Sequence, residues 1–424
     1  MNSAGDKEKR MGPLRSWIVA GILMSLAGTA LAGEATQAPS GPYAQWKFGP
    51  DKSPSYFPIG VWMQNPTAAP LYQKAGINLY VGLWQGPYEA QLKTLKKFGM
   101  PAVCAQNGVG LAHKDDPIIV AWTLQDEPDN AQSLGKDKGF GPPVPPEDVQ
   151  KSYQVVREAD PTRPVLLNFG EGAAWDGPRS RGSRVNHPED YAEYLKACDI
   201  ASFAIYPAAS SNPTIEGDLS LIAQGADHLT KWSDGKKIIW AFIECTRVNS
   251  GIKATPDEVK AEVWLAITHG ARGIVYFAHE FKPHFSEQAL LNDRPMLQAV
   301  TAINRQVTRL ARAINAAEPP GGVKVESTDA SVPISAMARE LDGDTYVFAV
   351  PMNEGATRAQ FALQNLPGDV LMEVVGEERD LNCADGKFSD DFQSWAVHIY
   401  KISKDEKQIG RKQARRNKAS EEEK

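Results

Sequence analysis

Cysteine is scarce in this chain, with four residues among 424. Cys104, Cys198, Cys245 and Cys383 form no C-x-x-C pair, so zinc-finger and thiol-redox motifs have no support. Their spacing suggests no disulfide framework, although a single bridge stays open. The first three lie in or beside apolar segments, where we expect buried free thiols.

A surplus of positive charge is also missing. The chain has 46 Lys and Arg against 52 Asp and Glu, a formal net charge of −6. This balance gives no electrostatic reason to expect a nucleic-acid partner. Basic residues do gather at 407–418, but Glu421, Glu422 and Glu423 follow. We therefore expect residues 403–424 to form a disordered charged tail.

Long apolar runs are rare, and the one that stands out is at the start. Arg10 and Arg15 precede an apolar run over 17–32, which ends in Ala30-Leu31-Ala32. This pattern predicts a signal peptide over 1–32, cleaved after Ala32. An uncleaved anchor is the alternative, but the run is shorter than the roughly 20 residues of a spanning helix. We expect a secreted or periplasmic protein with no stable membrane insertion after cleavage.

A regular alternation of strand and helix patterns occupies residues 55–318, after a Gly- and Pro-rich stretch at 33–54 that predicts a linker or extended arm. Short apolar runs lie at 57–62, 77–83, 101–105, 117–124, 164–168, 200–206, 237–243 and 273–277. Helical patterns lie at 67–75, 88–98, 146–159, 188–197, 218–232, 255–269 and 286–316, the last with a candidate break at Pro295.

This alternation predicts an α/β fold with parallel strands. Strands that are apolar throughout are typical of sheets buried on both faces. Eight units in about 260 residues favour a closed (β/α)8 TIM barrel over an open doubly wound sheet. The absence of a Gly-rich phosphate loop after the first run also disfavours a nucleotide-binding sheet.

The pattern changes after Pro319-Pro320-Gly321-Gly322. Short β-type runs follow at 333–338, 345–351, 359–363, 370–375 and 396–402, separated by turn residues. These runs predict a small antiparallel β-sandwich over residues 322–402.

Two carboxylates follow predicted barrel strands directly, and a TIM barrel carries its active site at that end of the strands. Glu127 comes after the fourth run, and Glu244 comes after the seventh. Taken singly, either residue could cap a helix or form a structural ion pair. The pair suits glycoside hydrolysis, in which a retaining enzyme places two carboxyl groups about 5–5.5 Å apart across the scissile bond.

The arrangement resembles the clan A glycoside hydrolases, which include many β-galactosidases, cellulases and mannanases. The resemblance implies that Glu127 is the acid/base and Glu244 the nucleophile of a retaining β-glycosidase that needs no cofactor and no metal. The predicted signal peptide adds that this enzyme would be secreted. Tyr206, followed by Pro207, matches the position whose Tyr hydrogen-bonds the nucleophile. Residues 270–277 look like the eighth strand of such enzymes.

Asp126 departs from the clan pattern, in which Asn usually precedes the acid/base. That Asn donates a hydrogen bond to the sugar 2-hydroxyl, whereas an ionised Asp can only accept one. The departure leaves the role of Glu127 standing but puts the substrate group in doubt. Like charge beside Glu127 would also raise its pKa, which suits an acid.

Other polar and aromatic residues are candidates for binding a carbohydrate substrate. Trp62, Trp84 and Trp175 lie in predicted mouth loops and could stack on sugar rings. Asn168 ends the fifth strand and could contact sugar hydroxyls.

His279 and Glu280 end the eighth strand, and we expect them to contact sugar hydroxyls. Two alternatives to a glycosidase stay open. One is a non-catalytic carbohydrate-binding barrel. The other, less favoured, is a metal-dependent hydrolase built on His279, Glu280 and Asp126.

Overall fold

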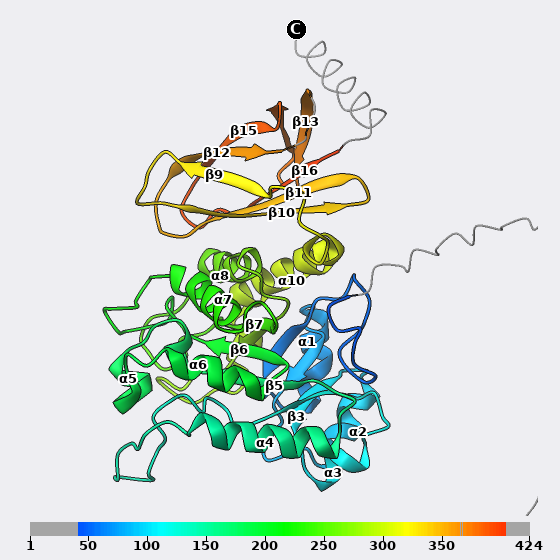
Figure 1. The fold of residues 1–424 in the computed structure, drawn as a ribbon, viewed down its shortest axis with the longest axis vertical. Coiled ribbons are helices and arrows are strands. Elements are labelled where there is room, and N and C mark those ends of the chain that lie inside the picture. Colours follow the sequence, from blue (N-terminus) through cyan, green and yellow to red (C-terminus); the bar gives the residue numbers. More distant parts are fainter. Residues whose placement is uncertain (1–40, 365, 367, 404–424) are drawn as a thin grey trace, which may run out of the picture. The chain divides into compact units, whose positions relative to one another are not determined.

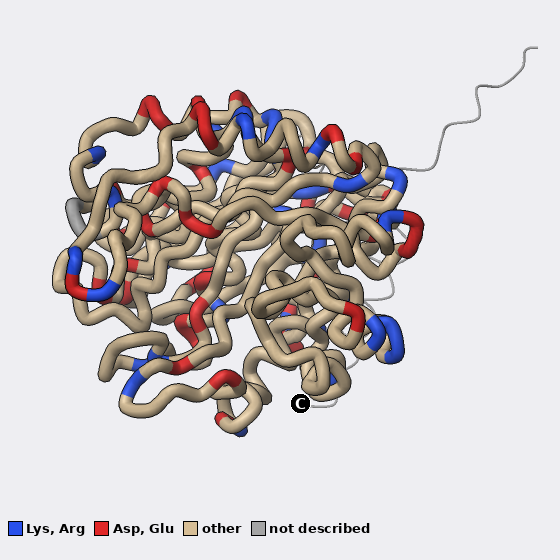
Figure 2. The backbone as a smooth tube through the Cα atoms, turned by 90° about the horizontal axis from the view of Figure 1, so that it is seen from below, with Lys and Arg blue, Asp and Glu red and all other residues tan. Residues whose placement is uncertain are grey.

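The computed structural model describes residues 41–364, 366 and 368–403. The predicted signal peptide and residues 404–424 of the predicted tail lie outside the described residues. Within the described ranges, no helix is long and apolar enough to cross a membrane. Figure 2 shows acidic and basic residues interspersed along the backbone, in line with their similar numbers.

Eight parallel strands close into a barrel, in which β8 pairs with β1. The barrel forms the lower part of Figure 1. The strands are β1 (Ile59–Trp62), β2 (Leu79–Val81), β3 (Ala102–Ala105), β4 (Ile119–Thr123), β5 (Val165–Phe169), β6 (Ile200–Ala204), β7 (Ile238–Glu244) and β8 (Ile274–Phe277). Each apolar run of the sequence is one strand, so the predicted TIM barrel is confirmed.

Helices and short 3-10 turns connect and surround the strands (Figure 1). The helices are α1 (Ala69–Lys74), α2 (Glu89–Lys97), α3 (Gly108–Ala112), α4 (Pro146–Ala159), α5 (Pro178–Arg181), α6 (Glu189–Tyr194), α7 (Ser220–Trp232), α8 (Pro256–Thr268), α9 (Ala289–Asn292) and α10 (Arg294–Ile314). The 3-10 turns are Pro66–Ala68, Glu171–Ala173, Gly182–Arg184 and Leu195–Ala197.

Two apolar cores explain why the strands read as continuous apolar runs. Inward residues such as Val81, Leu166 and Phe242 fill the barrel lumen. Outward residues such as Ile243 and Tyr276 pack beneath the helices. Burial on both faces leaves no polar face to alternate with an apolar one. The four cysteines are buried and free, as expected for the three in apolar segments.

The amino end of the barrel is closed by the described part of the predicted 33–54 arm. Tyr43 is fully buried, donates its hydroxyl hydrogen to the carbonyl of Arg272 (2.6 Å), and accepts from Trp240 Nε1 (2.9 Å). Trp46 packs into the lumen core beside it. Residues from 41 onward therefore belong to the barrel and are not a linker.

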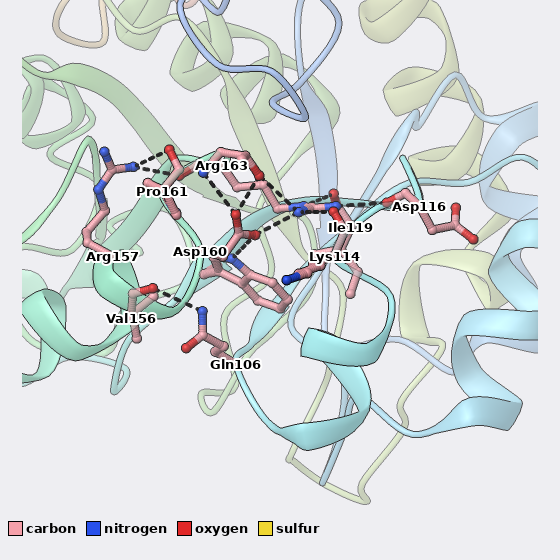
Figure 3. Close-up of polar contacts among 11 residues, drawn as sticks. Gln106, Lys114, Asp116, Ile119, Val156, Arg157, Asp160, Pro161 and Arg163 are labelled. Carbon is pink, nitrogen blue, oxygen red and sulfur yellow. Dashed lines mark hydrogen bonds and ion pairs between the residues drawn. The ribbon is translucent and has the colours of Figure 1, made fainter.

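Arg163 joins the loops that lead into β4 and β5 (Figure 3). Its buried guanidinium donates to the carbonyls of Lys114, Asp116 and Ile119, and pairs with Asp160 at 2.7 Å. A buried charge needs this degree of pairing. The network lies at the amino ends of the strands, away from the mouth, where we expect it to stabilise the barrel.

The last helical pattern, 286–316, is broken near Pro295 as predicted. Asp293 separates α9 from α10 and accepts a hydrogen bond from Met296 N through its side chain. Pro295 falls in the first turn of α10, where its missing N–H leaves no helical bond unmade.

Eight antiparallel strands form the C-terminal domain and curl around a second core, which confirms the predicted sandwich. They are β9 (Val323–Ser327), β10 (Ile334–Leu341), β11 (Asp344–Pro351), β12 (Thr357–Leu363), β13 (Asp369–Val374), β14 (Arg379–Ala384), β15 (Lys387–Phe392) and β16 (His398–Ile402). Their order in the sheet is β10-β11-β16-β13-β14-β15-β12-β9. The domain packs on α8 and α10 (Figure 1). In this contact Trp264 stacks on Phe348, with the ring centroids 5.4 Å apart.

Candidate active site

Left-handed backbone is concentrated in the loops that follow the barrel strands. Met63, Gln85, Glu127 and Val248 follow β1, β2, β4 and β7, with φ of 47°, 54°, 45° and 50°. This conformation is costly for residues other than glycine, above all for a β-branched Val. Such residues cluster at functional sites, where the surrounding structure holds them in place. These strained residues therefore mark the carboxyl end of the barrel as the candidate site.

A cavity of about 300 Å³ opens at this end, over the loops after β4 to β7. We call it the acidic cavity, because two carboxylic acids line it. Its lining residues are Glu127, Asn130, Glu171, Ser180, Ala204, Ile205, Tyr206, Ala209, Ser210, Ser211, Ile215, Val248, Asn249 and Ser250.

Glu127 is fixed at the acidic cavity by its backbone and by its side chain. Its N–H donates to the carbonyl of Asn168 at 3.0 Å, which extends the pairing of β4 with β5 by one bond. Asn130 Nδ2 donates to Glu127 Oε2 at 2.6 Å. One carboxyl oxygen is thus held, and the side chain keeps part of its surface exposed towards the cavity.

The surroundings of Glu127 favour its protonated form. Burial, followed by the negative charges of Asp126, Asp129 and Glu171, raises the pKa of Glu127 to about 8. The hydrogen bond from Asn130 opposes this effect without cancelling it. Glu127 therefore carries a proton at neutral pH, as a general acid must.

Asp126 starts a hydrogen-bonded chain across three strands. Asn168 Nδ2 donates to Asp126 Oδ1 at 2.9 Å, and Ser202 Oγ donates to Asn168 Oδ1 at 2.8 Å. Burial of its carboxyl group raises the pKa of Asp126 to about 6. Asp126 as a whole residue is exposed, whereas Glu127 is only partly exposed. We therefore assign the proton to Glu127 and not to Asp126.

Glu244 lies behind the wall of the acidic cavity. It is fully buried and is not among the lining residues. Its Oε1 accepts from Ala208 N (2.8 Å) and Ala209 N (3.3 Å), and its carboxyl group lies against that of Glu262 of α8. Because Ala209 also lines the cavity, the Glu244 carboxyl lies directly behind it. The sequence predicted that Glu127 and Glu244 both face the open mouth of the barrel. In the structure, Glu127 lines the cavity and Glu244 does not.

Tyr206 lines the acidic cavity between the two glutamates. Burial, followed by the negative fields of Glu127 and Glu244, raises the pKa of Tyr206 well above its ordinary value. Among the hydrogen bonds of the described residues, none joins Tyr206 to Glu244, in contrast to what the resemblance implied. Tyr206 is thus close enough to both acids for their charges to act on it, but it holds neither carboxyl group in place.

A second cavity, of about 550 Å³, lies next to the first and has a largely apolar wall. We call it the aromatic cavity. Its lining residues are Trp62, Met63, Gln64, Asn65, Pro66, Trp84, Tyr88, Gln91, Phe277, His279, Phe281, Phe285 and Glu287. Trp84 and Phe285 are 68% and 65% exposed, an unusual degree for such large apolar side chains. The rings of Tyr206 and Phe277, 5.2 Å apart, mark the border between the two cavities.

The predicted residues of the eighth strand do not act together. Gln64 Nε2 lies 3.3 Å from His279 Nε2, and burial lowers the pKa of His279. Glu280 pairs with Arg247 at 3.2 Å and lines neither cavity. In the part of the chain that the structure describes, no group of three or more His, Cys, Asp or Glu side chains could hold a metal ion. The alternative ligand set of His279, Glu280 and Asp126 therefore does not assemble.

The last of the predicted residues is Trp175, and two residues near the site, Glu262 and Asn130, were not predicted from the sequence. The Trp175 ring lies against Gly177, where an added Cβ would meet it at 2.1 Å, and it lines neither cavity. Trp62 and Trp84 do line the aromatic cavity. Glu262 was missed, although a lone acid on the apolar face of a helix was a usable signal. Asn130 gave no signal, because only the loop after β4 places it against Glu127.

No protein-family model matches the chain, and neither does any curated protein. Solved structures do share its fold. The chain is similar to the α-amylase from Geobacillus thermoleovorans complexed with acarbose, with a TM-score of 0.50 and 10% identity over 84% of this chain and 100% of that chain. It is also similar to α-galactosidase I from Mortierella vinacea, with a TM-score of 0.50 and 9% identity over 82% of this chain and 97% of that chain. At such low identities the likeness shows the fold alone, and the chain has the barrel-plus-β-domain fold of these structures.

Proposed function

We propose that this protein is a glycoside hydrolase whose general acid is Glu127. The observation that carries the proposal is the position of a protonated Glu127 in the acidic cavity, next to an aromatic-walled cavity suited to stacking on sugar rings. The two similar structures named above are an α-amylase and an α-galactosidase, which supports a carbohydrate substrate without fixing the anomer.

The chemistry needs a second carboxylate besides Glu127. A glycosidic oxygen leaves readily only when it is protonated, and Glu127 supplies that proton. We assign the attack on the anomeric carbon to Glu244, in a retaining mechanism on a β-glycoside. Burial raises the pKa of Glu244 to about 7, whereas its two backbone N–H bonds favour the charged form, and the residue ends a rigid strand. In this account, Tyr206 and Ala209 shift when substrate enters, so that Glu244 faces the cavity.

The test of Glu244 as the attacking group uses Glu171 as its control, because Glu171 is the other acid that lines the acidic cavity besides Glu127. The wild type is incubated with aryl β- and α-glycosides, alongside Glu244→Gln and Glu171→Gln. We expect the wild type to release the aryl group from a β-glycoside, Glu244→Gln to lose at least about 10³-fold in kcat, and Glu171→Gln to lose less than about tenfold. The reverse order would assign the attack to Glu171, and no release by the wild type from any glycoside would overturn the proposal.

The complete burial of Glu244 favours one second candidate, a carbohydrate-binding barrel without turnover. Calorimetric titration with oligosaccharides separates the two functions. Heat of binding without any product after prolonged incubation would support the binding protein. Product formation that depends on Glu127 would support the hydrolase.

We also propose that the protein is exported, because residues 1–32 have the pattern of a signal peptide. The mature protein recovered from outside the cytoplasm should begin at Gly33. N-terminal sequencing checks this, and a mature chain that keeps its first residues would contradict it.

A further inference from the structure

A second buried acid, Glu262, stands against Glu244. Glu262 lies on the inner face of α8, which it shares with the buried residues Val259, Leu265 and Ala266. Neither Glu262 nor Glu244 has any exposed surface, and their carboxyl groups lie within hydrogen-bonding reach of each other. Among the described residues, both oxygens of Glu262 and Oε2 of Glu244 lack any ordinary donor. Two ionised carboxylates would leave these oxygens facing one another with nothing to bind.

Among the described residues, the groups that act on the pair supply no positive charge. Those that face Glu262 are Glu244 and Cys245 of β7, Glu258 of α8 and Tyr276 of β8, all of which are acids. Lys253 also acts on Cys245, but it forms an ion pair with Asp293.

Two adjacent buried negative charges without a cation are far too costly to form. The pair must therefore hold one proton between its two carboxyl groups.

The donors around the pair decide where this proton sits. Glu244 Oε1 already accepts from the N–H groups of Ala208 and Ala209, which stabilise negative charge on Glu244. Burial, and then the charge of Glu244, raises the pKa of Glu262 well above its ordinary range. Both effects favour a neutral Glu262 that donates to an ionised Glu244.

We propose that Glu262 is a positioning residue that carries the shared proton and holds Glu244 as an oriented carboxylate. The inference rests on the proposed function, in which Glu244 is the nucleophile. When the bond from a Glu244 oxygen to the anomeric carbon forms, the bond to the leaving oxygen breaks and Glu127 protonates that oxygen. Glu262 keeps its own proton throughout.

Three variants test this assignment. Glu262→Gln keeps a hydrogen-bond donor of the same shape, and Glu262→Leu removes the donor. Asp257→Asn, at an exposed position of the same helix, is the control. The infrared C=O band of a protonated carboxyl group at neutral pH reports the proton whether or not the protein hydrolyses any glycoside. We expect this band in the wild type and in Asp257→Asn, and expect Glu262→Gln to lack the contribution of the buried pair. In Glu262→Leu, a band from a protonated Glu244 should replace it.

Kinetics then test the positioning role. Glu262→Gln should keep kcat within about threefold, whereas Glu262→Leu should lose roughly 10²-fold in kcat with little change in KM. In Glu262→Leu, Glu244 must take up the proton itself, so the acidic limb of the pH–rate profile should move to higher pH. A purely structural role would not move this limb.

Specific outcomes would overturn the inference. An unchanged infrared spectrum in Glu262→Gln would place the proton elsewhere. Equal pH profiles for the Gln and Leu variants would remove the positioning role. If Glu262→Leu does not fold, the spectra of the wild type and Glu262→Gln decide alone. If the wild type hydrolyses nothing, the spectra still decide where the proton lies, which separates this inference from the proposed function.

Discussion

At the scale of single residues, the neighbours of Glu127 favour its protonated form, which is the form that the proposed general acid needs. Glu127 follows a buried strand, it has a left-handed backbone, and other acids surround its carboxyl group. Burial and like charges both disfavour the ionised form of Glu127, so its carboxyl group keeps a proton that it could donate to a leaving oxygen.

The raised pKa of Glu127 predicts a stability change with pH. The folded state keeps the proton up to a pH of about 8, whereas the unfolded chain releases it near its ordinary pKa of 4.5. The folded state thus binds more protons across this window, and stability falls as the pH rises through it. Glu127→Gln should remove this loss and gain roughly 4 kcal/mol relative to the wild type between pH 5 and pH 9. Urea unfolding of both proteins at pH 5 and pH 9 measures this difference in stability. An equal change in stability with pH in the wild type and the variant would contradict the prediction.

Trp84 predicts a binding effect at the aromatic cavity. The ring is exposed and lines the cavity, so its removal should cost little stability. If it stacks on a sugar ring, Trp84→Ala should raise KM about tenfold and leave kcat nearly unchanged. Trp175→Ala, at a ring that lines neither cavity, is the control for kinetics. Equal KM values for Trp84→Ala and the wild type would remove Trp84 from the binding surface.

The placement of residues at strand ends could be predicted from the sequence, because a charged residue after a buried apolar run marks the end of the strand. Glu127 and Glu244 were found in this way. Whether each side chain faces the cavity could not be predicted. That depends on loops such as Tyr206 to Ala209, whose path is set by contacts between distant segments.

At the scale of elements, α8 positions Glu262 and has a clear start signal in the sequence. Thr255 Oγ1 accepts from Glu258 N, and Glu258 Oε2 accepts from Thr255 N, which forms a capping box. Thr255→Ala should lower the free energy of unfolding by about 1 kcal/mol, and Thr255→Ser should lower it much less. Urea unfolding measures both variants, and an equal loss in the two would show that the cap hydroxyl contributes nothing.

The barrel strands could be predicted because burial on both faces makes each a compact apolar run. The strands β9, β14 and β15 were missed for the opposite reason. Polar residues alternate with the few buried ones in them, as in Arg379–Ala384, where Cys383 is the buried side chain. A short strand of this kind is difficult to distinguish from a loop before its neighbours are known.

At the scale of the whole molecule, the β-sandwich shares its apolar contacts with the barrel. Trp264 of α8 is fully buried and stacks on Phe348 of β11. Trp264→Ala should lower the free energy of unfolding by about 3–5 kcal/mol, and Trp264→Phe, which keeps a ring there, by less. Denaturant unfolding followed by circular dichroism measures this. A loss below about 1 kcal/mol for Trp264→Ala would mean that the contact between the domains contributes little.

The order of the strands in the C-terminal sheet could not be predicted from the sequence, because neighbours in the sheet are often not consecutive in the chain. The strands β12 and β9 pair at one edge, while β10 and β11 lie at the other. The barrel differs, since consecutive strands are neighbours throughout. Periodicity alone therefore predicts its topology.

The central claim, that Glu127 protonates a glycosidic leaving group, is tested most directly by the dependence of the rate on that group. The measurement compares the wild type with Glu127→Gln on aryl glycosides whose phenols range from acidic to weakly acidic. A strongly acidic phenol leaves without protonation, so the variant should keep nearly the wild-type kcat/KM for that substrate, because kcat/KM reports the formation of the glycosyl-enzyme. The variant should lose about 10²–10⁴-fold on the weakly acidic phenol. An equal loss on every substrate, or no loss at all, would contradict the claim.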